Sequence, residues 1–348
     1  MTNIYPFKAI TPISRLEYEI QNKFIFCTHK KFDFSSEFYE NKLIYINNLL
    51  KQNLLQKHTN ESFYCCRISN RSFSVIGLIA LVNAGLVNKT IFKHERCIDI
   101  KEEIYIDHFK KYKTQISPII LVHEDNCQID RSLNSIINQD LPFFAISDDE
   151  YKYEIWTVTN LSFYKELYSS IDSFLIADGH HRISAINSLS QSKLITAFLT
   201  SVSCIKSANI YREYLEVSNL SKKNLLLFLN NNFDLVRGNG VNKSSLNKFL
   251  FKIDCNIYEV KDSNDQTRRN ILEFLDKSIN YKNNKLNFYN YSYNNKNSNL
   301  LLNDKNDVSI LIPAFKIMNG IDKLPLYPPH STLFYPKLPD GLISINVK

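Results

Sequence analysis

The sequence predicts an α/β protein built on a mixed sheet. Short apolar runs that fit strands recur between stretches with the apolar spacing of helices, and one apolar strand, Phe174–Ala177, passes directly into a helix over about His180–Leu189. The 348 residues are 44% hydrophobic, which is enough for a sizeable core and about two domains. We therefore expect strands and helices to alternate around at least one sheet.

The elements are expected in the following order. Helical spacing is found at 16–22 and 36–57, and a hairpin over Phe63–Ile68 and Phe73–Val82 follows. Next come a strand at Ile119–Val122, a helix over 128–140, a strand at Tyr153–Val158 and a helix over 160–170. Beyond the strand and helix at 174–189, Ile210–Val217 and Lys222–Asn231 resemble a helix-turn-helix, with Arg212 and Glu213 as a pair on a helix surface. Residues 279–306, rich in Asn and Lys, predict a loop or an edge hairpin, and Val308–Ile312 and Leu342–Val347 predict strands.

We divide the chain into three parts. Residues 1–205 form the core, and 206–307 form a helical or mixed insertion that contains the Asn/Lys-rich loop. Residues 308–348 supply C-terminal strands that pack back on the core.

Composition excludes several classes of protein. The net charge of +7 is spread without a dense basic stripe, so charge alone does not predict nucleic-acid binding. No apolar run is long enough for a membrane span, and the N-terminal residues lack a signal-peptide core. The seven cysteines form no CxxC pair, which favours reduced thiols over a disulfide framework or a zinc site. We expect a cytoplasmic protein without a membrane partner.

The most informative motif is Asp178-Gly179-His180-His181-Arg182, where a strand turns into a helix. Gly179 permits a tight turn, and the first N–H groups of the helix have no partner within it, so they favour an anion. Arg182 can bind phosphate oxygens, and His180 and His181 can donate hydrogen bonds or relay a proton. Asp178 can cap the helix, bind Mg²⁺ or accept a proton. The alternative is an ordinary capped helix with histidines on its surface.

Other candidate residues lie elsewhere in the chain. His94 and Glu95 follow an apolar pair, and Glu95 is a candidate general base, with a surface ion cluster of Lys93, Glu95 and Arg96 as the alternative. Ser331, Thr332 and Lys337 are candidates for phosphate contacts, with a proline-stiffened loop over Pro328–Thr332 as the alternative.

The order of several motifs resembles that of the domain-of-unknown-function 1015 family. The motifs are Tyr5–Ile10, Gly77–Val82, Lys93–Arg96, Ser117–Ile119, Trp156–Thr159, the signature Ala177–Arg182, and Pro328–Thr332 through Lys337 to Gly341-Leu342. The signature is also similar to the phosphate-binding corner of the ParB/sulfiredoxin-like superfamily, which includes free-serine kinases. The resemblance implies a ParB/sulfiredoxin-like core, residues 1–205, with an added C-terminal region.

The resemblance also implies a function. It favours a kinase that uses ATP or ADP with Mg²⁺ to phosphorylate a small hydroxylated metabolite, with free L-serine as a candidate. Glu95, His94, His180 and His181 would be catalytic, while Asp178, Gly179, His181, Arg182, Ser331, Thr332 and Lys337 would bind phosphate or nucleotide. Asp178 would also bind the Mg²⁺.

Two alternatives stay open. The chain departs from the family pattern at Phe26–Lys30, Ile104-Tyr105 and His330, which favours a non-catalytic protein that binds a nucleotide or phospho-metabolite. A DNA-associated, partition-like regulator that uses residues 210–232 is the other alternative.

Overall fold

The computed structural model describes residues 3–13, 44, 47–48, 50–189, 193–214, 217–238, 247–262, 264–278, 286–290, 308–315, 317, 320–321 and 324–346. The chain divides into two compact units. Unit 1 comprises Met1–Lys206, Asn319–Leu324 and Pro336–Lys348, and unit 2 comprises Ser207–Met318 and Pro325–Tyr335. The chain therefore leaves unit 1 to build unit 2 and later returns.

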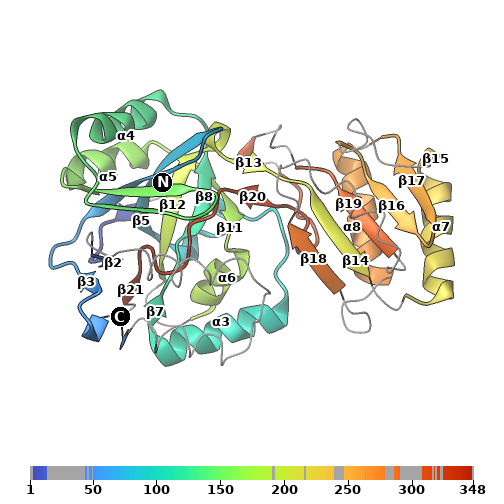
Figure 1. Cartoon of the computed structure of the whole chain (residues 1–348), viewed down its shortest axis with the longest axis horizontal. Helices are drawn as coiled ribbons and strands as arrows, with labels where there is room; N and C mark the ends of the chain where they lie inside the picture. Colours follow the sequence, from blue (N-terminus) through green and yellow to red (C-terminus); the bar gives the residue numbers. More distant parts are fainter. Residues whose placement is uncertain are drawn as a thin grey trace. The chain divides into compact units, whose positions relative to one another are not determined.

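Unit 1 is built on a mixed sheet (Figure 1). Its strand order is β6-β11-β8-β12-β5-β4-β10-β9, and β1 pairs with β5. The neighbours β11–β6 and β12–β8 are parallel, whereas the other pairs are antiparallel. The strands are β1 (Ile4–Tyr5), β4 (Phe63–Ser69), β5 (Ser74–Asn83), β6 (Ile91–Phe92), β8 (Ile119–His123), β9 (Phe144–Ser147), β10 (Lys152–Val158), β11 (Phe174–Asp178) and β12 (Leu194–Ser201).

Helices cover both faces of this sheet (Figure 1). On one face lie α4 (Cys127–Gln139) and α5 (Leu161–Ser169), and on the other lie α6 (His180–Ser188) and α3 (Asp99–Tyr112). A strand that is covered on both faces needs apolar residues throughout, so its sequence shows no alternation of apolar and polar residues. Strands β8 and β11 are such strands and are buried almost throughout. The predicted mixed α/β fold is confirmed, and the predicted hairpin is β4–β5 with Ser69 opposite Ser74.

Two small ladders complete unit 1. Strand β2 (Ile10–Pro12) pairs with β3 (Leu55–Lys57), and β7 (Thr114–Gln115) pairs with β21 (Ile345–Asn346). Ser344 also exchanges backbone hydrogen bonds with Ile10. The C-terminal segment is thus tied to both the beginning and the middle of unit 1. Two 3₁₀ turns, η1 (Ala84–Leu86) and η2 (Val202–Cys204), follow β5 and β12.

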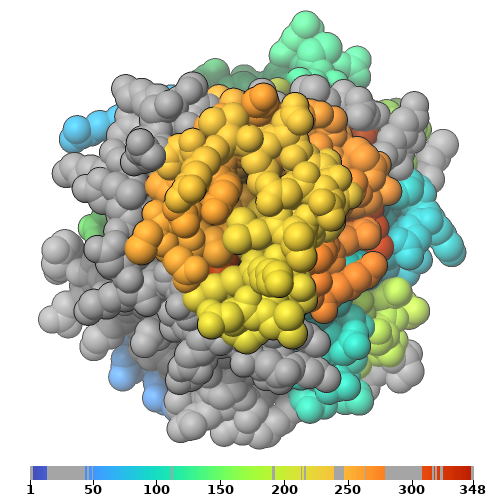
Figure 2. All heavy atoms as spheres, turned by 90° about the vertical axis from the view of Figure 1, so that its right-hand side faces the viewer, coloured from blue at the N-terminus to red at the C-terminus, as the bar shows by residue number. Residues whose placement is uncertain are grey.

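Unit 2 contains an antiparallel sheet with the order β15-β17-β16-β19-β14-β18. The strands are β14 (Ile210–Tyr214), β15 (Leu235–Gly238), β16 (Leu250–Ile253), β17 (Asn256–Val260), β18 (Leu286–Asn290) and β19 (Val308–Ile312). The two helices described in this unit are α7 (Asn219–Asn232) and α8 (Asp265–Ser278). The face turned toward the viewer in Figure 2 is formed largely by α7 and neighbouring segments of the same unit. Strands β13 (Lys206–Ser207) and β20 (Phe334–Tyr335) form a further pair.

Some predicted elements were wrong or missing. The expected helix-turn-helix does not form. Its first predicted helix is instead strand β14 at Ile210–Tyr214, and its second corresponds to helix α7. Arg212 is therefore not on a helix surface; its side chain is 1% exposed. Helix 16–22 lies outside the described residues, and the end of the expected helix 36–57 is strand β3. Within 279–306 the structure describes only β18, which is the edge strand of its sheet.

Strand direction brings several chain segments to the same end of the unit 1 strands. This end, at which β11 finishes, is called the sheet edge below. Asp178 ends β11, while Ser117-Pro118 precedes β8, which runs antiparallel to β11. Lys93-His94-Glu95 follows β6, which runs parallel to β11. The residues before β4 and after β10 lie at the same edge, because β12, β5, β4 and β10 are successively antiparallel and β12 is parallel to β8. The candidate site is built at this edge.

Candidate functional site

The turn between β11 and α6 requires glycine. Gly179 has a φ of 97°, in the left-handed region that side chains disfavour. A Cβ at this position would lie 2.4 Å from Cγ2 of Ile119, which leaves no room for any other residue. The pairing of β11 with β8 also shifts register between Ile176 and Asp178, as in a β-bulge. These features turn the chain sharply so that α6 begins at the sheet edge.

The first turn of α6 keeps its backbone donors uncapped by a side chain. Gly179 is the N-cap residue and supplies no side-chain acceptor, and the helical ladder begins with Ile183 N–H donating to Gly179 O at 3.0 Å. Uncapped N–H groups at a helix start attract anions, so the structure is compatible with anion binding here, which stays a prediction. The predicted capping role of Asp178 is not used, since no side chain caps this helix.

The Asp178 carboxylate is held between two cations instead. Arg182 donates from Nη2 to Oδ2 at 2.6 Å, and Lys337 donates from Nζ to Oδ1 at 2.6 Å. Burial acts to raise the pKa of Asp178, but Lys337 and Arg182 outweigh it and hold this pKa below its usual value. With both oxygens engaged by cations, this carboxylate does not suit Mg²⁺, and no cluster of three metal-ligating side chains occurs among the described residues.

Arg182 joins α6 to the start of β8. Its Nη1 donates to the carbonyl and the hydroxyl oxygen of Ser117, at 2.9 and 2.8 Å, and to Pro118 O at 3.0 Å. The guanidinium therefore clamps the Ser117-Pro118 turn beside Gly179 as well as contacting Asp178. Ser117 was noticed in the sequence only as part of a strand entry, so its part in this clamp was missed.

Two buried imidazoles lie beside the turn. His94 is 0% and His180 7% exposed, and their rings meet edge to face with centroids 4.6 Å apart. Burial lowers the pKa of His94 to about 3 and the pKa of His180 well below its usual value, so both are neutral at neutral pH. Among the described residues, Nε2 of His180 has no hydrogen-bond partner. A buried ring nitrogen without a partner is costly, which indicates a place for a ligand or a water molecule.

Glu95 lies next to this pair. Its Oε1 is 3.9 Å from Nε2 of His94, and its side chain is 10% exposed. Because His94 is neutral, the contact is not an ion pair. The alternative was a surface ion cluster of Lys93, Glu95 and Arg96. Arg96 is exposed, but Glu95 is buried, so the cluster as a whole is not on the surface.

His181 points to helix α3. Its Nε2 accepts a hydrogen bond from the backbone N–H of Ile98, the N-cap residue of α3, at 2.9 Å. An accepting Nε2 places the ring proton on Nδ1. Burial lowers the pKa of His181 to about 4, so the ring stays neutral and keeps this bond. The structure thus places His181 as a link between α6 and α3.

Two lysines that sequence reasoning did not select lie near α6. Nζ of Lys93 donates to Oγ of Ser184 at 3.3 Å. Lys101, on α3, is close enough to lower the pKa of His181, and burial lowers its own pKa to about 8. No sequence signal pointed to Lys101, because helix α3 itself was not predicted. With Arg182 and Lys337, these lysines give the first turn of α6 a cationic surrounding.

Ser331 and Thr332 belong to unit 2 and are described within that unit alone. The Ser331 hydroxyl donates to Pro328 O at 2.5 Å and is fully buried. Two buried guanidiniums hold this loop, since Arg212 donates to His330 O at 2.7 Å and Arg268 donates to Ser331 O at 3.3 Å. The proposed phosphate contacts of Ser331 and Thr332 stay predictions.

The site and fold define a two-unit α/β protein with an uncapped, cation-lined helix start. The chain belongs to the family described as "Protein of unknown function (DUF1015)", whose model matches residues 33–278. No curated protein matches the chain. Among the described residues, no helix is long and apolar enough to cross a membrane.

Solved structures similar to this chain include a conserved hypothetical protein from Pyrococcus furiosus (13% identity, TM-score 0.47, covering 78% of this chain and 95% of that one). A free serine kinase in complex with AMP is 13% identical with a TM-score of 0.47, and 78% of this chain and 91% of that chain are covered. A variant of a free serine kinase in complex with ADP is 13% identical with a TM-score of 0.49, over 78% and 92% of the two chains. These similarities are remote.

Proposed function

We propose that the protein binds a nucleotide at the first turn of α6 and transfers a phosphoryl group to a small hydroxylated metabolite. ATP or ADP is the proposed donor and free L-serine the first acceptor to test, which would place the protein in cytoplasmic serine metabolism. The observation that carries the proposal is the uncapped start of α6, with the unpartnered, buried Nε2 of His180 beside it. Backbone donors at a helix start, surrounded by cations, suit phosphate groups.

The proposed chemistry uses neutral groups and one carboxylate. Glu95 would take the proton from the acceptor hydroxyl while the hydroxyl oxygen forms a bond to the phosphorus. The bond from this phosphorus to the bridging oxygen of the nucleotide would break at the same time. His180 is neutral, so its Nε2 could donate one hydrogen bond to the transferring group without competing for the acceptor's proton. Lys93, Lys101 and Lys337 would offset the negative charge of the phosphates.

The test is turnover by the purified protein. It is incubated with ATP, ADP or CTP and a pool of amino acids and other hydroxylated metabolites, and products are followed by ³¹P NMR and mass spectrometry. We expect a phosphorylated product, which Glu95→Gln abolishes. Glu124→Gln, an exposed residue just after β8, is the matched control and should leave turnover unchanged. Absence of nucleotide turnover under all conditions would contradict the kinase proposal.

A second function, non-catalytic binding of a nucleotide or phospho-metabolite, is favoured by one specific observation. The Asp178 carboxylate binds Arg182 and Lys337, and Arg182 also binds Ser117. With both of its oxygens bound to cations, the carboxylate is unsuited to Mg²⁺. Thermal stabilisation of the protein by a nucleotide without any turnover would support this second function.

A further inference from the structure

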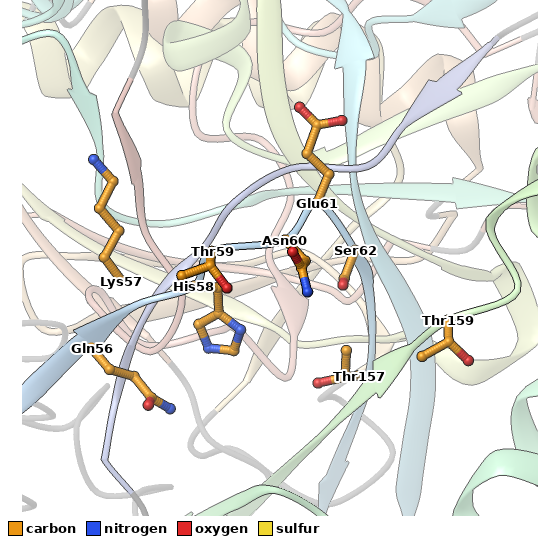
Figure 3. A pocket seen from close by; sticks show the side chains of 9 residues that line it. All are labelled: Gln56, Lys57, His58, Thr59, Asn60, Glu61, Ser62, Thr157 and Thr159. Atoms are coloured by element: carbon orange, nitrogen blue, oxygen red, sulfur yellow. The ribbon is translucent and has the colours of Figure 1, made fainter.

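A polar cavity of about 490 Å³ opens at a different part of unit 1 (Figure 3). It lies against the chain from β3 to the start of β4 and the end of β10, and its walls are Gln56, Lys57, His58, Thr59, Asn60, Glu61, Ser62, Thr157 and Thr159. This volume is within the range of about 300–1,000 Å³ that is typical of small-molecule sites.

The cavity is separate from the candidate site. It shares the sheet edge with Asp178, but β11 is separated from β4 by β8, β12 and β5. Four strand spacings correspond to roughly 20 Å, far beyond the contact distance of about 3.5 Å that a group transfer needs. A molecule in this cavity therefore cannot be the acceptor of a phosphoryl group held at α6.

The polar groups of the cavity have unused hydrogen-bonding capacity. Apart from His58, no lining side chain bonds to another described residue in the structure. Ser62 is the most informative, because it is only 7% exposed and its hydroxyl still makes no such bond. In Figure 3 Ser62, which is buried, lies near the exposed Asn60 and Thr157, with the exposed Thr159 at one side. A buried hydroxyl that faces a cavity without a partner gains free energy from a ligand that pairs with it.

His58 is a fixed, neutral member of the cavity wall. Its Nε2 and the Thr11 hydroxyl are 2.9 Å apart, and Thr11 is fully buried. The ring also meets Tyr64 and Phe143 edge to face, at centroid distances of 5.5 and 5.4 Å. Burial lowers the pKa of His58, which keeps the ring uncharged at neutral pH. Since Nε2 is used by Thr11, Nδ1 is the ring nitrogen left for a ligand.

The charges of the cavity lie at its margin. Lys57, Glu61, Asn60 and Thr157 are all exposed, but in Figure 3 the charged ends of Lys57 and Glu61 point away from the group formed by His58, Asn60, Ser62 and Thr157. The centre thus offers hydroxyl, amide and imidazole groups, each of which can pair with a hydroxyl. It offers no fixed charge to match a phosphate, a carboxylate or an ammonium group.

We propose that this cavity binds a small neutral polyhydroxylated compound, a polyol or a monosaccharide, through Ser62, Asn60, Thr157 and His58. Such a ligand presents several hydroxyls at once, and each can donate and accept. The site is a second one on the same sheet edge and is independent of phosphoryl transfer at α6.

The test is saturation-transfer NMR on the full chain, without nucleotide, using xylitol, glucose and myo-inositol as probes. We expect at least one of these to bind, and we expect Ser62→Ala combined with Thr157→Val to weaken its binding at least tenfold, since two hydrogen bonds to the ligand are lost. Ser72→Ala, an exposed turn serine, is the matched control and should bind as the wild type does.

Charged compounds are the decisive comparison. Glucose 6-phosphate and serine should not compete with the bound probe at the same concentration. The proposal is overturned if none of the three neutral probes binds, if binding survives the double substitution, or if only a charged compound binds in a way that depends on Ser62 and Thr157. Because no nucleotide is present, none of these results depends on whether the protein is a kinase.

Discussion

Nζ of Lys337 lies 2.6 Å from Oδ1 of Asp178, although 159 residues separate them in the chain. Arg182 binds the other oxygen of the same carboxylate at the same distance. The C-terminal segment of unit 1 therefore contributes directly to the turn that begins α6. Lys337 was selected from the sequence as a phosphate-binding residue, and its position beside Asp178 is compatible with that proposal.

Lys337→Met should reduce stability at neutral pH by up to about 1 kcal/mol, a small effect because the lysine side chain is 36% exposed. The pKa of Asp178 is lowered in the folded protein, so this contribution is present above the carboxyl's unfolded pKa and disappears as pH falls through the folded pKa. Urea unfolding at pH 7 and at pH 2.5 measures the difference. Lys57→Met, an exposed lysine, is the control, and an equal loss at both pH values would contradict the prediction.

Gly179→Ala should destabilise the protein by about 2–4 kcal/mol, because it adds strain at a positive φ to a clash with Ile119. Gly85→Ala is the matched control. There the nearest atom to a new Cβ is a side-chain oxygen of Asn83 at 3.0 Å, and φ is not positive, so the loss should be smaller. Chemical denaturation measures the free energy of unfolding of both variants, and the loss should be larger for Gly179→Ala. An equal loss for Gly85→Ala would refute the prediction.

Binding of a polyphosphate at α6 should be coupled to proton uptake by Lys101. Burial lowers the pKa of this amine to about 8, and a nearby polyanion would raise it again. At pH 8 the wild type should therefore take up a fraction of a proton when tripolyphosphate binds, as measured by calorimetry in two buffers of different ionisation enthalpy.

The Lys101→Arg variant separates proton uptake by residue 101 from the affinity of the protein for tripolyphosphate. The arginine stays charged, so binding should persist while the additional uptake disappears, and Lys101→Met should lose both. Any proton that tripolyphosphate itself gains or loses on binding is the same for the wild type and both variants, so it cancels in the comparison. Equal uptake in the wild type and the arginine variant would show that another group takes up the proton.

Two buried histidines, His94 and His180, and the half-buried His181 should make the protein sensitive to mild acid. The pKa values of His94, His180 and His181 are lowered in the folded state, so the unfolded chain binds more protons below pH 6.5. Stability should be full above pH 6.5 and should fall as pH drops toward about 4. His181→Asn, which keeps an acceptor, should reduce the slope of unfolding free energy against pH by about one proton. An unchanged slope in this variant would contradict the assignment.

The candidate turn could be predicted because it is a local feature. A buried strand, a glycine and a helix with an apolar face stand next to one another in the sequence, and each restricts backbone conformation within a few residues. Contacts made by the same residues were harder to predict. Arg182 contacts Ser117 across 65 residues, and nothing in either segment indicates the other.

Helix α3 and strand β14 show why other parts of the fold were missed. In α3 the apolar residues Ile104, Tyr105 and Ile106 are consecutive and give no single stripe, so the helical spacing is weak. In β14 the charged Arg212 was interpreted as a surface residue. Its guanidinium is instead buried by hydrogen bonds to the Pro328–Thr332 loop more than a hundred residues away, which sequence spacing cannot indicate.

The return of the chain to unit 1 has a consequence for biosynthesis. Lys337 emerges from the ribosome 159 residues after Asp178, which at common elongation rates is roughly ten to thirty seconds later. During that interval Arg182 is, among the described residues, the cation that hydrogen-bonds to Asp178, and β7 has no β21 to pair with. The nascent chain must therefore hold an unfinished N-terminal unit while all of unit 2 is translated, so a chaperone that protects this sheet edge would matter most in that interval.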